Sequence, residues 1–273
     1  MAALHPGEAE TTAVRRTVGS VAPTVLRAVL ELLLVLAMFE FYRWGRLLAR
    51  GETAAAYAHA LRVHHLEHNL HLPSEAMLQS LVPSDTLLHA ANFYYFSVHF
   101  PSMIAFLVWG YLFRPRAQYH WARNLVAALT GAALVVHIVY PLAPPRMFPQ
   151  WGFIDTMATF GPNAYAGTSG AMANQFAAMP SLHIGWAAII AYVIYRTGPR
   201  WLAWVAAGHL ALTILVVVVT ANHYWLDGLV ALALVGVAIL VVPKPTVSEE
   251  EPPLPEPEPV VLQLPHRDSC LDR

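Results

Sequence analysis

Long apolar stretches alternate with short polar ones along most of this chain. A helix needs roughly 20 apolar residues to cross the ~30 Å hydrocarbon core of a bilayer. Six stretches come close to or exceed that length: 24–48, 87–113, 121–142, 179–196, 201–220 and 223–242. The pattern predicts an all-α, polytopic membrane protein, built as a six-transmembrane-helix bundle.

The segments between and around these stretches differ from them in composition. Residues 1–20 carry charges and lack a signal-type cleavage site, so we expect a cytoplasmic leader before a membrane domain at 21–243. Residues 52–82 are too rich in histidine and glutamate to cross lipid and predict an interfacial helix. Residues 244–273 are rich in Pro and Glu, which predicts a disordered tail.

Charge and cysteine usage exclude several other classes of protein. Charged residues make up only 12% of the chain, fewer than a soluble protein of this length needs at its surface. The formal net charge of −1 provides no basic field, so nucleic acid is not an expected partner. A single cysteine, Cys270 in the tail, excludes both an internal disulfide framework and a multi-cysteine metal site.

The distribution of cations predicts the orientation in the membrane, because Lys and Arg near helix ends favour the cytoplasmic side. With the N-terminus inside, eight fall on that side: Arg15, Arg16, Arg27, Arg114, Arg116, Arg196, Arg200 and Lys244. Four fall on the other: Arg46, Arg50, Arg62 and Arg146. This majority favours a topology in which loop 143–178 lies on the non-cytoplasmic face, and we expect the protein in the plasma membrane.

Three polar motifs interrupt the apolar second half of the chain. They are Pro144-Pro145-Arg146, Met179-Pro180-Ser181-Leu182-His183 and Asn222-His223-Tyr224-Trp225-Leu226-Asp227. Tight turns at Gly198-Pro199 and Ala221-Asn222 require the last three helices to alternate in direction. The third apolar stretch ends on the face where the fourth and sixth begin, so all three motifs should meet there.

The residue types in these motifs suit covalent phosphoryl transfer. His223 and Asp227 are four apart, so on a helix the carboxylate can accept a hydrogen bond from the imidazole and leave its other nitrogen able to attack. His183, from a separate helix, can protonate a leaving alkoxide. Ser181 and Arg146 can bind the phosphate.

Two helix starts should complete this phosphate site. Pro180 is suited to the first position of one helix and Asn222 to the N-cap of another. Helix N-termini expose unpaired N–H groups, which bind anions. We therefore expect both N-termini to face the phosphate.

At these residues the sequence resembles the phosphatidic acid phosphatase type 2 superfamily, and more closely its inositol phosphorylceramide synthase-like (inositolphosphotransferase) branch. The resemblance covers about 93–242, with Met-Pro-Ser-Leu-His at 179–183 and His-Tyr-Trp-Leu-Asp at 223–227 in place of Pro-Ser-Gly-His and His-x-x-x-Asp. It implies a six-helix bundle without a required metal or cofactor. It also implies residue roles: His223 as phosphohistidine, Asp227 as its orienting acid, His183 as general acid, and Ser181 and Arg146 as phosphate ligands.

The sequence departs from the phosphatase pattern in its cations. Val217 stands where the phosphatases carry Arg six residues before the last His, Leu182 replaces the Gly of the second motif, and the first motif is Pro-Pro-Arg. Fewer positive charges are compatible with the transferase branch. We therefore expect a lipid phosphotransferase that acts on a phospholipid or lipid phosphate donor and an alcohol or polyol acceptor.

Two other functions remain open from sequence alone. A lipid phosphate phosphatase would have the same residues with water in place of the acceptor alcohol. A non-catalytic transporter or assembly protein could keep the helical bundle without the chemistry.

Several other residues have two interpretations. The cluster His64, His65, Glu67, His68 and His71 could bind zinc or could belong to a surface helix. Arg146 could instead be an interfacial anchor, and Ser181 a simple helix cap. Aromatic residues of the loop could cover the site or could be ordinary packing: Phe148, Trp151, Phe153 and Tyr165.

Some polar residues inside the apolar stretches are expected to be structural. Glu31 and Glu40 should either pair, with Arg27 and Arg43 respectively, or face a groove of the bundle, since unpaired charges in lipid are costly. Alternatively, one of these glutamates could bind a polyol headgroup. Hydrogen-bonded structural roles are expected for the remaining intramembrane histidines: His89, His99, His120, His137 and His209.

Overall fold

The computed structural model describes residues 25–45, 52–162 and 175–245. Regular structure in these ranges is helical, and the one β-type contact in them is an isolated bridge between Leu142 and Ala177. The all-α fold class is confirmed. The predicted leader, and all but the first two residues of the predicted tail, lie outside the described residues.

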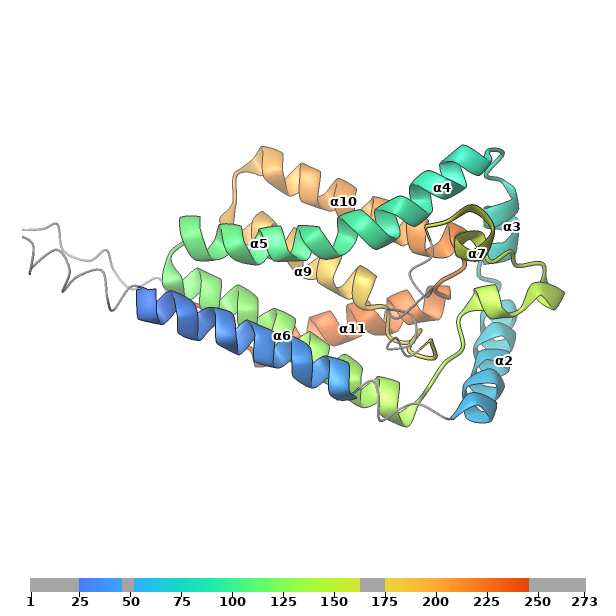
Figure 1. Cartoon of the computed structure of the whole chain (residues 1–273), viewed down its shortest axis with the longest axis horizontal. Coiled ribbons are helices and arrows are strands. Elements are labelled where there is room, and N and C mark those ends of the chain that lie inside the picture. Colours follow the sequence, from blue (N-terminus) through green and yellow to red (C-terminus); the bar gives the residue numbers. More distant parts are fainter. Residues whose placement is uncertain (1–24, 46–51, 163–174, 246–273) are drawn as a thin grey trace, which may run out of the picture. The chain divides into compact units, whose positions relative to one another are not determined.

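Each of the six predicted stretches contains a helix (Figure 1). The first helix covers residues 25–45. The second is continuous through α4 (Asp85–Phe93), the π-helical turn η1 (Tyr94–Val98) and α5 (His99–Phe113). The others are α6 (Arg116–Val139), α9 (Leu182–Thr197), α10 (Arg200–Val219) and α11 (Trp225–Val241).

Length and composition make three helices of the described chain able to cross a membrane: Asp85–Phe113, Arg116–Val139 and Arg200–Val219. The apolar α11 has 17 residues and is shorter. The chain is thus a membrane protein with several long apolar helices, while six crossings remain a prediction.

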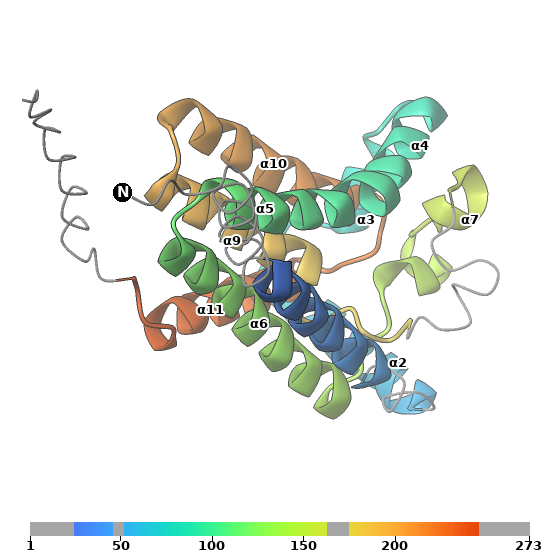
Figure 2. The same cartoon turned by 60° about the vertical axis from the view of Figure 1, so that its left-hand side comes forward.

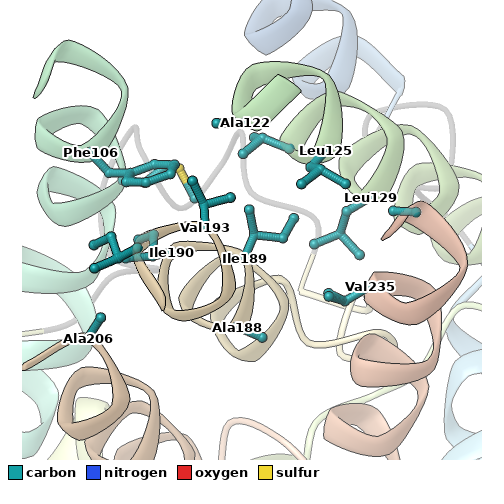
Figure 3. Packing of buried hydrophobic residues seen from close by; sticks show 14 of the residues in the cluster. Phe106, Ala122, Leu125, Leu129, Ala188, Ile189, Ile190, Val193, Ala206 and Val235 are labelled. Carbon is teal, nitrogen blue, oxygen red and sulfur yellow. The ribbon is translucent and has the colours of Figure 1, made fainter. Parts of the chain in front are cut away.

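Helix α9 lies at the centre of the bundle. It is apolar almost all round, a pattern typical of a helix buried on every side. Its residues Ile189, Ile190 and Val193 pack against Leu125 of α6, Phe106 of α5 and other residues of the same buried cluster (Figure 3). The helix that carries His183 is therefore held by its neighbours along its length.

Small residues let two neighbouring helices approach α9 closely. A Cβ at Gly185 of α9 would lie 2.7 Å from a methyl of Leu129 on α6. A Cβ at Gly228 of α11 would lie 2.7 Å from the terminal methyl of Ile184. Small residues at helix interfaces serve this purpose in membrane bundles. The close α9–α11 contact lies within one turn of both His183 and Asp227.

The first helix lies along α6 in both views (Figures 1 and 2). Its Glu31 pairs with Arg123 of α6 at 2.5 Å and accepts a hydrogen bond from Tyr119 at 3.0 Å. The expected partner Arg27 was wrong, because α6 offers a cation and a hydroxyl that the local sequence does not reveal. The expected pair Glu40–Arg43 is present at 2.6 Å.

The segment 52–82 forms two helices instead of one. Helix α2 (Thr53–Asn69) ends where His71 adopts a left-handed φ of 55°, and α3 (Glu75–Ser80) starts after Pro73 with Ser74 as its N-cap. Both helices bury polar residues, namely Glu67, Glu75 and Gln79.

Candidate active site

The three polar motifs meet at one end of the bundle. The backbone N–H of Arg146 donates to Ala221 O at 2.8 Å, directly before Asn222 and His223. The N–H of Ser181 donates to Asp227 O at 3.1 Å. The rings of His183 and His223 lie 5.7 Å apart between centroids. One phosphate group can bridge this separation, since catalytic nitrogens act at roughly 3 Å from the reacting atoms.

A tight turn that ends α10 places His223. The N–H groups of Ala221 and Asn222 donate to Val218 O and Val217 O, and Ala221 has a φ of 54°. This is a Schellman ending, with alanine at the left-handed position where glycine is usual. The expected N-cap role of Asn222 was wrong, because its N–H closes the preceding helix.

His223 consequently lies in the connection before α11, since that helix starts at Trp225 with Tyr224 as its N-cap. The expectation that His223 and Asp227 share a helix face was wrong, but the two side chains still meet. Nδ1 of His223 lies 2.9 Å from Ala178 O and 3.3 Å from Asp227 Oδ2. A carbonyl oxygen can only accept, so Nδ1 carries the proton.

The other ring nitrogen of His223 has no hydrogen-bond partner within the described part of the chain, although the residue is only 4% exposed. Asp227 is fully buried, and its Oδ2 also accepts the N–H of Tyr224 at 2.9 Å. In the neutral imidazole, these contacts hold the proton on Nδ1 and leave the lone pair on Nε2. This is the arrangement that a nitrogen nucleophile requires.

Ser181 caps the start of α9. Its hydroxyl accepts the N–H of Ile184 at 3.4 Å, and the residue is fully buried. Pro180 precedes this cap, so its expected place at the first helical position was wrong. The cap puts His183 in the first turn of α9, facing His223. Capping does not prevent contact with a phosphate, and that role of Ser181 stays a prediction.

Arg146 belongs to the short 3-10 turn η2 (Pro145–Met147) and is 4% exposed. An interfacial anchor with its stem along lipid would be far more exposed. Burial therefore contradicts the anchor interpretation. Its role as phosphate ligand stays a prediction.

The start of α11 is occupied by two carboxyl groups that sequence reasoning did not place there. Glu67 Oε1 accepts the N–H of Leu226 at 2.8 Å, and Glu75 Oε1 accepts the N–H of Trp225 at 3.2 Å. With Tyr224 N–H bonded to Asp227, the first N–H groups of this helix already have acceptors. The prediction that two helix N-termini bind the phosphate was wrong for α11.

Burial, reinforced by a hydrogen bond with Glu75, raises the pKa of Glu67 to about 9. Glu67 therefore carries a proton at neutral pH and can share it with Glu75. Its position in a helix beside several histidines was the only sequence signal, and that signal had suggested zinc.

No group of three metal-binding side chains forms among the described residues, which include the histidines of α2. His64 stacks instead on Trp151 at 4.2 Å, and His59 stacks on Tyr140 at 3.9 Å. The zinc interpretation gains no support, and the contacts with the loop favour a packing role for α2.

The described part of the aromatic loop is packed, not loose. Phe148 and Phe153 are 3% and 4% exposed, and Phe148 stacks on Trp151 of η3 (Pro149–Trp151) at 4.0 Å. Tyr165 lies outside the described residues. The described part of the loop packs against α2 in one buried cluster at this end of the bundle.

Two buried amides that sequence reasoning missed hold the loop to the bundle. Gln79 Nε2 donates to Ile154 O and Val219 O at 3.0 Å, and Gln79 Oε1 accepts Ile154 N–H at 2.8 Å. Asn92 donates to Thr156 O at 2.8 Å, in the short helix α7 (Thr156–Phe160). These bonds connect α3 to Ile154 and to the end of α10, and α4 to α7.

The profile of the PAP2 superfamily matches residues 61–241. The chain therefore belongs to this superfamily of membrane phosphatases and phosphotransferases that act on lipids. The match does not distinguish the inositolphosphotransferase branch from others. A search of curated proteins and a search of solved structures gave no match.

Proposed function

We propose that this protein is a lipid phosphotransferase of the inositolphosphotransferase type, which works through a phosphohistidine on His223. The observation that carries the proposal is the state of that imidazole. Its Nδ1–H is held by Ala178 O and Asp227, while its buried Nε2 has no hydrogen-bond partner among the described residues. A buried ring nitrogen without a hydrogen-bond partner, in an imidazole whose centroid is 5.7 Å from that of a second histidine, suits attack on phosphorus.

The charges of the site favour a phosphodiester donor over a phosphomonoester. The three motifs contain one permanently cationic side chain, that of Arg146. A phosphomonoester approaches two negative charges near neutral pH, because its second pKa is about 6. A phosphodiester carries one, which a single guanidinium can match. This balance supports transfer from a phospholipid over hydrolysis of a lipid monophosphate.

The chemistry has two steps. First, Nε2 of His223 forms a bond to phosphorus as the bond to the lipid oxygen breaks, and His183 gives its proton to that oxygen. Asp227 stabilises the positive charge that develops on the His223 ring. An acceptor alcohol then loses its proton to His183, its oxygen bonds to phosphorus, and the N–P bond breaks.

The predicted orientation in the membrane indicates on which face the site lies. The distribution of Lys and Arg supports a site at the non-cytoplasmic face of the membrane. We place the protein in the plasma membrane, where a polyol or a second lipid would be the acceptor.

Trapping of the intermediate tests the proposal. Full-length purified protein is incubated with phospholipids labelled in the phosphate and quenched in alkali, because phosphohistidine is labile in acid. We expect label on the wild type and on His120→Asn, an exposed control, and none on His223→Ala. Unchanged biological function of His223→Ala would favour a non-catalytic transporter or assembly protein.

Product analysis separates transferase from phosphatase. Addition of inositol or a lipid diol should convert the released group into a new phosphodiester. Release of free phosphate from a lipid phosphomonoester, unaffected by any acceptor, would instead establish the phosphatase.

A further inference from the structure

The second helix contains a π-helical turn beside the candidate site. Residues Tyr94–Val98 form this turn between α4 and α5, and the N–H of His99 donates to Tyr94 O, five residues earlier. A π-turn inserts one extra residue, and such turns are rare and frequent at functional sites. The wider turn lets Tyr94, Tyr95 and His99 all contact residues of α9 and α10.

These side chains extend from His183 to His209 through a series of ring contacts. Tyr95 stacks on His183 with 4.1 Å between centroids and 23° between planes. His99 lies 4.7 Å from His183 and 5.7 Å from His209, almost parallel to the latter at 9°. The Tyr94 hydroxyl lies 2.6 Å from Nδ1 of His209. His183 thus has an aromatic neighbour from the π-turn and another from the residue that follows it.

The burial of His99 at this position costs folding free energy. It is 1% exposed, and both its ring nitrogens lack a hydrogen-bond partner within the described ranges. Leaving a buried polar group unsatisfied costs roughly 1–3 kcal/mol. The expected role as a hydrogen-bonded structural histidine was therefore wrong for His99. His89 and His209, by contrast, do make such bonds, to Phe160 O and to Tyr94.

We propose that Tyr95 and His99, presented by the π-turn, are positioning residues for His183 that hold its imidazole in line for proton donation to the leaving oxygen. The inference rests on the proposed function of His183 as general acid. Two rings in contact with the imidazole restrict its rotation, and the face of the tyrosine ring stabilises its protonated form. Both residues contact His183 directly, so their main effect should fall on proton donation to the leaving oxygen.

The leaving group of the substrate tests this role. Two donors are compared: the phospholipid that labels His223 best, whose alkyl oxygen needs a proton to leave, and 4-nitrophenyl hexadecyl phosphate, whose nitrophenolate does not. General acid catalysis contributes about 10²–10⁴-fold. His183→Ala should therefore slow phosphorylation of His223 by roughly that factor with the first donor, and far less with the second.

Variants of Tyr95 and His99 should also lose more activity with the phospholipid than with the nitrophenyl donor, but the loss should be smaller than for His183→Ala. We expect His99→Leu and Tyr95→Leu to lose about 10–100-fold with the phospholipid and less than about 3-fold with the nitrophenyl donor, a fraction of the full acid effect. Tyr95→Phe keeps the ring and should retain activity. His99→Leu should leave the unfolding temperature unchanged or raise it, because it removes an unsatisfied buried polar group.

The outcomes separate the two hypotheses. Equal losses with both donors for His99→Leu, or a lower unfolding temperature, would show a structural role and overturn the inference. Equal losses with both donors for His183→Ala would overturn the general-acid role of His183 in the proposed function, whereas absence of label on the wild type would overturn the phosphohistidine itself.

Discussion

The carboxyl group of Glu67 on α2 accepts a hydrogen bond from the N–H of Leu226 on α11, 2.8 Å away. Glu75 makes the equivalent bond to Trp225, and the next residue after Leu226 is Asp227. The segment outside the long apolar helices is therefore bonded to the turn that carries the orienting acid. A change in the protonation of Glu67 should be transmitted to this turn.

The raised pKa of Glu67 predicts a pH-dependent stability. The pKa moves from 4.5 to about 9 on folding, so this contribution to stability is complete below pH 4.5 and is lost as pH rises through about 9. Glu67→Gln keeps a carbonyl acceptor for Leu226 and cannot ionise. We expect its unfolding temperature to fall less between pH 5 and pH 9 than that of the wild type, as measured on detergent-solubilised protein.

The exposed Glu52, whose side chain makes no cap hydrogen bond, provides the control. Glu52→Gln should follow the wild-type pH curve. A Glu67→Gln curve parallel to that of the wild type would contradict the assignment.

Asp227→Asn should leave the orientation of His223 largely intact while lowering its reactivity as a nucleophile. The amide can still occupy the buried site but cannot stabilise a positive imidazole. We expect phosphorylation of His223 to slow by roughly 10²–10⁴-fold. The rate of label incorporation measures this effect. A variant that labels at the normal rate would show that Ala178 O alone orients the ring.

The sequence predicted the helices well because their signal is local. Runs of apolar residues mark helices whatever their neighbours are, and the two short connections forced the motifs to one end. The start of α11 was misplaced because Asn222, a good N-cap by type, is used to end α10. Glu67, Glu75 and Gln79 were missed because a polar residue in a mixed segment looks solvent-facing until the helix that buries it is known.

Gln79 should be important for stability rather than for chemistry. Gln79→Leu leaves the carbonyls of Ile154 and Val219 and the N–H of Ile154 without their partner. We expect the free energy of unfolding to fall by about 2–4 kcal/mol, from buried groups left unsatisfied. Chemical denaturation in detergent measures the change. Ser80→Ala, an exposed neighbour, should have little effect. Equal losses in both variants would contradict a stabilising role for the Gln79 hydrogen bonds.

Arg146 should affect donor binding more than folding. Arg146→Lys keeps the charge but loses the planar fork that binds two phosphate oxygens. We expect the KM for the phospholipid donor to rise about 10-fold, as expected for about 1.4 kcal/mol of lost binding. Arg62→Lys on the exposed face of α2 is the matched control. An unchanged KM would remove Arg146 from the phosphate site.

The pair between Glu31 and Arg123 joins residues 92 positions apart in the sequence. During synthesis, the first helix reaches the insertion machinery long before α6 exists. An unmatched acid in a nascent span disfavours release into lipid, by roughly 2.5–3.5 kcal/mol for Asp at a helix centre. If the first helix spans the membrane as predicted, we expect it to be stable in lipid only once α6 supplies Arg123. This ion pair would then set the order in which the first helix and α6 assemble.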